Sequence, residues 1–187
     1  MFNSKKEERR KMERVRASYS KGMYFSTIFF TIVLLCASCY MFYRMSKYHE
    51  DLWYFLMMGC AAIVLGTLVY AYVSQLKYVY ISKDYLILKK KIGNITIPIN
   101  SIKQVQPKKN IIYDIRLWGI SGLFGHIGWF WNKKLGKYFA LVKNEKDMFI
   151  IKTYNNKFYV VSCDNSVEVI KQLVSLLKKE DTVPMYK

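Results

Sequence analysis

The sequence predicts a helical hairpin long enough to cross a membrane, followed by a mainly-β domain that ends in one α-helix. Two apolar runs predict the hairpin, because no charged residue lies between Gly22 and Tyr43 or between Leu52 and Leu76. Short segments of alternating polarity after Leu76 predict the strands. The 187 residues carry a net charge of +17 but are also 52% hydrophobic, which excludes a wholly disordered chain and indicates that charged and apolar residues are segregated.

The first 21 residues form a basic segment that we expect to be a cytoplasmic helix. Ser4–Lys21 contains neither Pro nor Gly, and Glu7 and Lys11 are four residues apart, a spacing that stabilises helices. The simplest role of this charge is to set the topology of the spans that follow. Recruitment of anionic lipid or of a partner is the alternative.

Residues 22–43 and 52–76 are each predicted to span the membrane. At a rise of about 1.5 Å per residue, roughly 20 apolar residues cross a hydrocarbon core of about 30 Å, and both runs are longer than this. Buried helices of a soluble bundle and a signal peptide are the alternatives. Eight basic residues lie within residues 1–21 and only two within 44–51. The positive-inside rule therefore places the hairpin tip outside and both termini in the cytoplasm, in a multi-pass protein of the cell inner membrane.

The spans contain features of helix packing but none of ion transport. No Asp, Glu, Lys, Arg or His interrupts them, which argues against a pump or transporter. Gly59, Ala62 and Gly66 form a stripe of small residues that lets two helices approach closely. We expect this stripe to pack the hairpin on itself, and homo-oligomerisation through it is the alternative.

The cysteines are expected to serve packing. Cys36 and Cys39 form a C-x-x-C pair, but they lie in mid-span, where a low dielectric disfavours the reactive thiolate. A bridge or metal site that includes Cys60 is the alternative, and Cys163 is predicted to be buried. No His, Cys, Asp and Glu cluster has the spacing of a metal site, so no cofactor is expected.

The domain is predicted over residues 77–179, ahead of a frayed tail at 180–187. Short turns such as Ser82–Lys83 indicate antiparallel meanders that form a small sandwich or partly open barrel. A closing helix is expected from Asn165, which stands three residues before Glu168 as a helix cap. The seven predicted strands are 77–81, 84–89, 95–99, 102–106, 138–143, 148–153 and 158–162, and the apolar stripe of the helix comprises Val167, Ile170, Leu173, Val174 and Leu177.

The stretch from Arg116 to Tyr138 interleaves glycines with aromatic residues. It lacks the residue order of a phosphate-binding loop. Two uses stay open: a bend across the sheet opening that buries the aromatic rings, or a membrane-facing lip with Trp rings and lysines at headgroup level. The candidate membrane or partner surface comprises Arg116, Trp118, Trp129, Trp131, Lys133, Lys134 and Lys137.

The order of residues in this stretch resembles the bacterial PH-like domain family. The resemblance rests on Arg116-x-x-Gly-x-x-Gly-Leu-Phe-Gly-x-x-Gly128, on Asn132-x-x-Leu-Gly-x-Tyr138, and on Phe158-Tyr-Val-Val-Ser-Cys-Asp164. It covers about residues 77–178 and implies two antiparallel sheets with a C-terminal helix, often preceded by a two-helix membrane hairpin. It implies little about chemistry, and the basic headgroup motif of eukaryotic PH domains is not evident, since only Lys83 lies in the first turn.

These observations predict a non-enzymatic membrane protein whose PH-like domain binds a protein partner or anionic lipid headgroups at the cytoplasmic face. The alternatives are a small oligomeric channel, an accessory subunit of a membrane complex, and an enzyme that would use His126 and Asp114. His49 is expected on the other side of the membrane from His126. Lys89–Lys91, Lys108 and Lys109 are further basic clusters for lipid or an acidic protein surface, and no nucleic-acid partner is expected.

Overall fold

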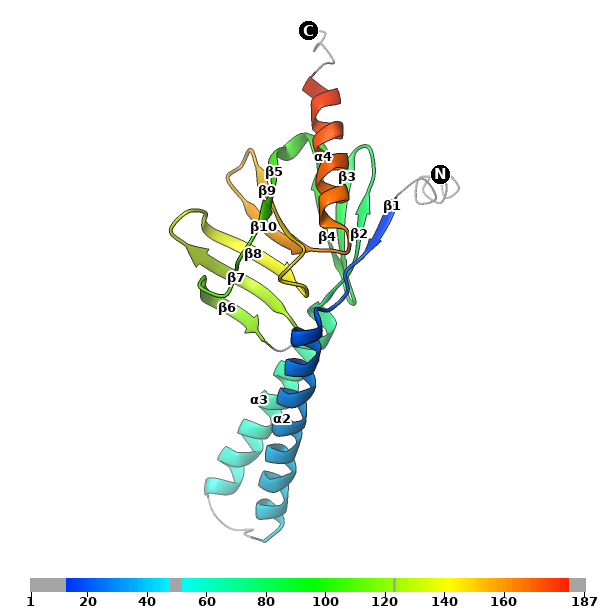
Figure 1. The fold of residues 1–187 in the computed structure, drawn as a ribbon. Helices are drawn as coiled ribbons and strands as arrows, with labels where there is room; N and C mark the ends of the chain where they lie inside the picture. The colour runs from blue at the N-terminus through cyan, green and yellow to red at the C-terminus, as the bar shows by residue number, and fades with distance from the viewer. Residues whose placement is uncertain (1–12, 48–51, 123, 182–187) are drawn as a thin grey trace, which may run out of the picture.

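A computed structural model of the chain describes residues 13–47, 52–122 and 124–181, and it shows a helical hairpin that projects from a β-rich domain (Figure 1). The predicted hairpin tip at 48–51, the N-terminal residues 1–12 and the tail 182–187 lie outside the described residues. The hairpin joins the domain through the start of its first helix and the end of its second, so both connections are on one side.

The hairpin consists of helices α2 (Lys21–Lys47) and α3 (Leu52–Ser74). Both are long and apolar enough to cross a membrane, over Lys21–Arg44 and Phe55–Ser74. Very few of these residues are buried inside the chain, whereas a core helix of a soluble protein would be covered. The second helix ends two residues earlier than predicted, because Leu76 already belongs to the first strand of the domain.

The first sheet has four antiparallel strands in the order β1-β2-β3-β4. Three of them match predicted segments: β2 (Leu76–Ile81), β3 (Tyr85–Lys90) and β4 (Asn94–Pro98). The fourth corrects the prediction of an N-terminal helix, because Glu13–Arg16 forms strand β1 and pairs with β2.

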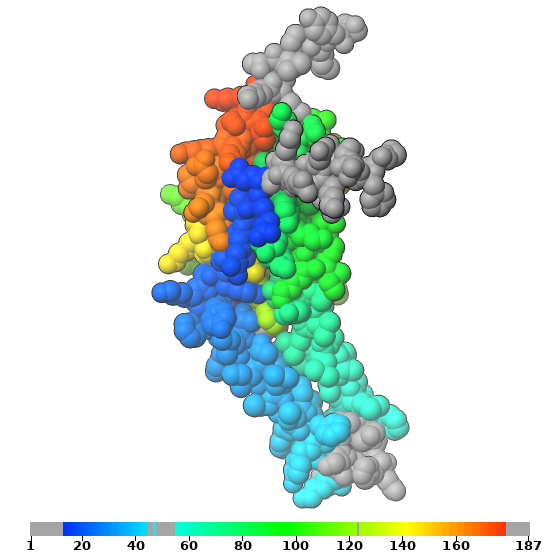
Figure 2. Space-filling model, turned by 90° about the vertical axis from the view of Figure 1, so that its right-hand side faces the viewer, coloured from blue at the N-terminus to red at the C-terminus, as the bar shows by residue number. Residues whose placement is uncertain are grey.

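Long-range pairing explains why β1 is not helical. Val15 packs against the core, and the Arg14 guanidinium lies 4.3 Å from the centre of the Tyr78 ring. These contacts outweigh a helix propensity that differs by less than about 1 kcal/mol per residue. Figure 2 shows β1 in blue between the last helix, in orange, and the first sheet, in green.

The second sheet has six strands in the order β5-β9-β10-β8-β7-β6. Strand β5 (Ile102–Lys108) follows a short 3-10 helix, η1 (Ile99–Ser101). Strands β8 (Gly136–Val142), β9 (Met148–Thr153) and β10 (Phe158–Ser162) match predicted segments. The two sheets are antiparallel as predicted except for one pair, because the β9–β10 hairpin inserts between β5 and β8 and leaves β10 parallel to β8.

Strands β6 (Ile115–Ser121) and β7 (His126–Asn132) occupy the Gly/Trp-rich stretch, for which no strand was predicted. Gly119 faces Gly128 across the pair, and a Cβ on either would lie within 2.2 Å of a carbonyl oxygen of the facing strand. Both have positive φ, which favours glycine. The glycines therefore permit close strand contact rather than a bend that buries the aromatic rings.

The main core lies between the two sheets and the last helix, α4 (Ser166–Asp181). Val79 and Leu88 meet Leu141 and Val161 there. A second cluster covers the other face of the six-stranded sheet, around Phe130, Tyr138 and Val160. The side chains of β9 and β10 are therefore buried on both faces.

Helix α4 closes the main core as predicted, with one shift in its buried face. Leu173 is fully buried, but Val167 is 64% exposed and Val169 takes its place in the core. Asn165 has a positive φ, and its carbonyl oxygen accepts from the N–H groups of Glu168 and Val169. The predicted capping position therefore lies at the start of the helix, but its main chain is left-handed.

Candidate functional site

Four of the apolar residues on β6 and β7 form an exposed face that we call the aromatic surface: Ile115, Trp118, Trp129 and Trp131. The register places them on one side of the sheet, because Trp118 pairs with Trp129 and Ile115 pairs with Trp131. Trp118 is 75% exposed. The arrangement is that of a cluster of rigid apolar side chains open to a partner.

The aromatic surface continues the face of the sheet that carries the main core. Ile127, two residues before Trp129 on the same face, is buried in that core. Phe139 lies next to Trp129, with ring centroids 5.2 Å apart, and packs partly against the core. The first sheet does not cover the outer part of this face, so it stays exposed.

The predicted basic residues are distributed around this surface rather than gathered on it. The Lys137 ammonium lies 4.7 Å from the centre of the Trp129 ring, a cation–π contact on the same face. Arg116 pairs with Phe130 and therefore points to the opposite face. Lys133 and Lys134 are exposed in the β7–β8 turn.

The two ends of β7 differ in their distance from the hairpin. The β6–β7 turn lies beside helices α2 and α3, whereas the β7–β8 turn lies at the end of the strands that is away from them (Figure 1). The predicted lip is thus divided: Trp118 and Trp129 are nearer to the helices, and Lys133 and Lys134 are at the far end.

The β6–β7 turn fixes the domain to the hairpin. The Phe124 N–H donates to Thr27 Oγ1 at 3.0 Å, and the Phe124 ring lies edge-on to the Tyr72 ring at 6.1 Å. Phe124 has a φ of 59°, which is uncommon for a residue with a side chain and marks a tight turn. One loop of the domain therefore contacts both helices.

The β3–β4 turn makes a second attachment. The N–H of Ile92 donates to the carbonyl of Val73 at 3.0 Å, and the N–H of Lys91 donates to the carbonyl of Gln75 at 2.9 Å. The first bond satisfies a carbonyl in the last turn of α3, where helix carbonyls have no partner within the helix, and the second satisfies the carbonyl of Gln75, which directly follows the helix. The domain and the hairpin are hydrogen-bonded to each other at two places.

The two candidate catalytic residues are not brought together. Asp114 accepts from Asn132 Nδ2, from Lys108 Nζ at 2.7 Å and from the Tyr138 hydroxyl, and it lies beside the far end of β7. Burial and this hydrogen bond to Asp114 raise the pKa of Tyr138 well above its ordinary value. His126 begins β7 at the other end.

His126 has two partners that the sequence did not suggest. Its Nδ1 lies 2.8 Å from Ser121 Oγ, and its Nε2 lies 2.7 Å from Glu145 Oε1. Ser121 is its direct neighbour across the β6–β7 pair, so a prediction of these two strands would have found it. The three side chains tie the β6–β7 hairpin to the β8–β9 turn.

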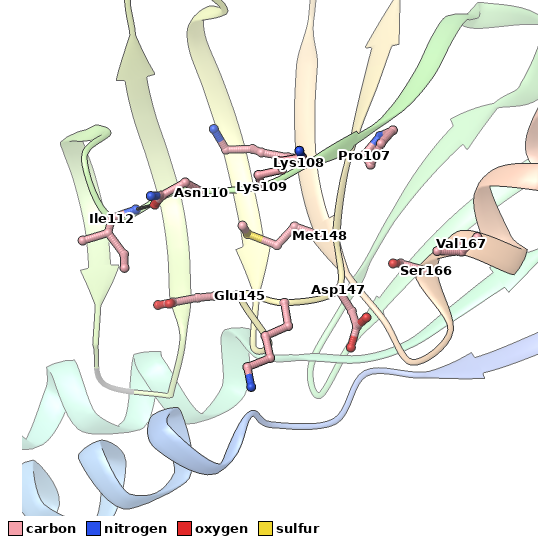
Figure 3. Close-up of a pocket in the computed structure, with 11 residues that line it drawn as sticks. Pro107, Lys108, Lys109, Asn110, Ile112, Glu145, Asp147, Met148, Ser166 and Val167 are labelled. Carbon is pink, nitrogen blue, oxygen red and sulfur yellow. Dashed lines mark hydrogen bonds between the residues drawn. The ribbon is translucent and has the colours of Figure 1, made fainter.

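The predicted lysine cluster at Lys108 and Lys109 lines a separate cavity of about 420 Å³. Figure 3 shows it between the end of β5, the β8–β9 turn and the start of α4, where Ser166 lies. Lys108 is paired with Asp114, and Glu145 and Asp147 contribute acidic groups to the lining. The mixture of charges does not select for one sign of ligand.

The small-residue stripe of α3 does not pack the hairpin on itself. Gly59, Ala62 and Gly66 are exposed, and a Cβ built on either glycine would meet nothing within 4 Å. The prediction of intramolecular packing is therefore wrong, and the stripe faces outward.

The cysteines are all free. Cys163 is buried as predicted, and Cys36, Cys39 and Cys60 are exposed on the helices. Within the described parts of the chain, no group of three or more His, Cys, Asp or Glu side chains could hold a metal ion.

Comparison with known proteins identifies the domain. A family model described as the bacterial PH domain matches residues 76–177, which is more than half of the 187 residues. No curated protein and no solved structure matches the chain.

Proposed function

Because the chain belongs to the bacterial PH domain family, we propose that it is a non-enzymatic membrane protein whose helices α2 and α3 hold the domain at the cytoplasmic face to bind a protein partner. The basic residues before α2 and throughout the domain favour this orientation under the positive-inside rule. The observation that carries the proposal is the exposed aromatic surface on β6 and β7.

The attachment of the domain to the hairpin makes this surface useful for binding. The Phe124–Thr27 hydrogen bond lies at one end of the β6–β7 pair, and the aromatic surface begins a few residues from it. A surface held in a fixed orientation loses less freedom on binding than one on a flexible tether. A partner in the same membrane would meet it in one orientation.

The chemistry of the surface favours a protein partner with an apolar centre and an acidic rim. Trp residues are the side chains that most often dominate binding interfaces, and Lys137 adds positive charge beside Trp129. Lipid headgroups are the other candidate. They fit less well, because the strands lead away from the helices toward Lys133 and Lys134. An accessory role in a membrane complex agrees with this arrangement.

His126 and Asp114 are both engaged in hydrogen bonds with neighbouring side chains, and this supports a non-enzymatic function. Both ring nitrogens of His126 are within hydrogen-bonding distance of side chains, and Asp114 accepts bonds from three groups.

The binding proposal can be tested by photo-crosslinking in intact membranes. A photoreactive residue in place of Trp118 should capture a protein, and capture should decrease when Trp129→Ala and Trp131→Ala are added. Tyr154 is also exposed but lies in the β9–β10 turn, so a photoreactive residue there is the matched control. Capture of lipid alone at Trp118 would favour the headgroup alternative, and equal protein capture at both positions would overturn the proposal.

The orientation is tested separately. Reporter tags at residues 1 and 187 should both be cytoplasmic, and an external signal from either would contradict it.

A further inference from the structure

A buried lysine without an acceptor lies where the domain meets both helices. Lys143 follows strand β8 and is only 8% exposed, and its ammonium lies 4.0 Å from the centre of the Tyr19 ring. Among the described residues, Lys143 Nζ forms no hydrogen bond or ion pair with an oxygen, and this nitrogen keeps some exposed surface within a largely buried side chain. A buried ammonium ordinarily has an anionic or carbonyl partner, because an uncompensated charge is costly in a protein interior.

Gln75 supplies a second unused donor in the same place. Its side chain is 1% exposed, and its Oε1 accepts from the Tyr19 hydroxyl at 2.5 Å. Its Nε2 is buried and has no partner among the described residues. Buried amide groups are normally hydrogen-bonded, so this nitrogen marks a position for an acceptor that the described residues do not provide.

Two more cations act on Lys143, and the Asp164 carboxylate, which also acts on it, is already engaged. Lys91 in the β3–β4 turn and Arg16 at the end of β1 act electrostatically on Lys143, and both are exposed. Asp164, between β10 and α4, accepts from the N–H of Ser18 at 3.1 Å and from its hydroxyl at 2.8 Å. The cluster therefore joins the largely buried Gln75 and Lys143 to the exposed Lys91 and Arg16, and the Lys91 ammonium also lies 3.1 Å from the centre of the Tyr72 ring.

We propose that Lys143, Gln75, Lys91 and Arg16 form a binding site for a phosphate-type anion, either the phosphodiester of an anionic lipid or free phosphate. We call it the junction anion site. An anion here would accept from Gln75 Nε2 and from the Lys143 ammonium, and it would offset the repulsion among the three cations. Multiple cationic donors are the usual means of binding phosphate.

The position of the site favours a lipid as the source of the anion. Tyr19 lies two residues before α2, and Gln75 directly follows α3. If the two helices span the membrane as proposed, the headgroup phosphates of the inner leaflet lie at this level. The lipid source therefore rests on the proposed membrane location, whereas binding of free phosphate does not.

The electrostatic state of Lys143 agrees with an anion site. Burial, together with the charges of Lys91 and Arg16, lowers its pKa from 10.5 to about 8, and Asp164 acts in the opposite direction. A bound phosphate would raise this pKa again, because an anion favours the charged form of the amine.

The test uses the full-length protein in uncharged maltoside micelles, with the thermal unfolding midpoint as the readout. The probes are inorganic phosphate and dioctanoyl phosphatidylglycerol, with chloride at equal ionic strength and dioctanoylglycerol as their controls. We expect at least one probe to raise the midpoint beyond its control, since a ligand that binds only the folded state stabilises it. If only the lipid stabilises the protein, the anion that binds is the phosphodiester of a lipid. If inorganic phosphate stabilises it, free phosphate is sufficient for binding.

Variants locate the effect. Lys143→Met should weaken binding about tenfold or more, and Lys143→Arg should retain most of it. The matched control is Lys146→Met, an exposed lysine in the same turn. Arg16→Gln changes an exposed side chain, so it keeps the test valid if Lys143→Met does not fold. It should weaken binding severalfold.

The proposal is overturned if neither probe raises the unfolding midpoint, or if the probes raise the midpoints of Lys143→Met and Arg16→Gln as much as that of the wild type. Crosslinking at Trp118 is read independently, so failure of the partner proposal and failure of this one are distinguishable.

Discussion

The backbone N–H of Phe124 donates to Thr27 Oγ1 at 3.0 Å, and this bond joins the β6–β7 turn of the domain to the first long helix. The Thr27 hydroxyl in turn donates to the carbonyl of Met23 at 2.7 Å. One side chain thus connects helix α2 to the strand pair that carries the aromatic surface. Together with the attachment at the β3–β4 turn, this contact fixes the surface relative to the helices.

Thr27→Val should loosen the attachment without unfolding the domain. Valine has nearly the same shape but no hydroxyl, so the Phe124 N–H loses its acceptor, at a cost of about 1–3 kcal/mol for a buried group. Hydrogen exchange of the amides in the β6–β7 turn should become faster, while exchange in β9 and β10 should not change. Thr31→Val is the control, because the Thr31 hydroxyl donates only within α2, to the carbonyl of Thr27. Equal exchange rates in both variants would contradict the proposed role of the contact.

The sequence was sufficient to predict the strands whose own residues alternate, but not those defined by distant partners. Strands such as β9 (Met148–Thr153) carry enough β-branched and aromatic residues to be recognised locally. Strand β1 was mistaken for a helix because its residues are charged, and only its pairing with β2 makes it a strand. Strands β6 and β7 were missed because glycine weakens a strand in isolation.

The candidate sites, like the strands, were predicted where local sequence was informative and missed where residues from distant segments come together. Trp118, Trp129, Trp131 and Lys137 were chosen from composition, and pairing places them together on one face. Of the cluster around Lys143, only Lys91 was predicted, as part of the basic run Lys89–Lys91. Arg16, Gln75, Lys91 and Lys143 come from four separate segments, and no local pattern connects them.

Gly128→Ala should destabilise the domain more than alanine at a glycine that has open space around it. An added Cβ would lie 2.2 Å from the carbonyl oxygen of Trp118, and the φ of 131° is unfavourable for alanine. We expect a loss of at least about 3 kcal/mol, the size of other severe steric changes. Gly122→Ala has the φ problem but nothing within 4 Å, so it should cost only about 1 kcal/mol.

Gly66→Ala provides the baseline for this comparison, because it has open space around it and lies in a helix. Its unfolding midpoint should equal that of the wild type. If Gly128→Ala and Gly66→Ala gave the same midpoint, close packing of β6 on β7 would not be the reason for the glycine.

Asp114→Asn should remove a central polar contact of the second core cluster. The Asp114 carboxylate pairs with Lys108 at 2.7 Å, and both side chains are about nine-tenths buried. Leaving the Lys108 ammonium unpaired should cost about 3–5 kcal/mol in the free energy of unfolding, measured by urea titration. Asp84→Asn changes an exposed carboxylate and should have almost no effect.

The double variant Lys108→Met with Asp114→Asn tests the cause. It removes both charges together, so it should recover part of the loss seen with Asp114→Asn alone. A loss equal to the sum of the two single variants would show that the pair is not coupled.

Lys143 should make the folded protein more stable as the pH rises from about 8 to 9. Its pKa is lowered to about 8 in the folded chain against 10.5 in the unfolded chain, so over this range the unfolded chain binds the proton that the folded chain has released. The free energy of unfolding then rises with pH, by up to about 1 kcal/mol per pH unit for one group. The charged groups that face Lys143 are Lys91, Arg16 and Asp164. The Tyr19 ring also contacts Lys143, and burial raises the pKa of its hydroxyl to about 12, above this range. Above pH 9 the trend is opposed by Cys163, whose pKa is raised by burial to about 12, so that its contribution to stability is lost as the pH rises further.

The measurement is therefore the difference between the wild type and Lys143→Met, by urea titration of the full-length protein in maltoside micelles between pH 7.5 and 9. Only the wild type should gain stability over this interval, and saturating phosphate or phosphatidylglycerol should reduce the gain by raising the pKa of the lysine. Parallel profiles for the two proteins would show that the buried ammonium keeps its proton throughout.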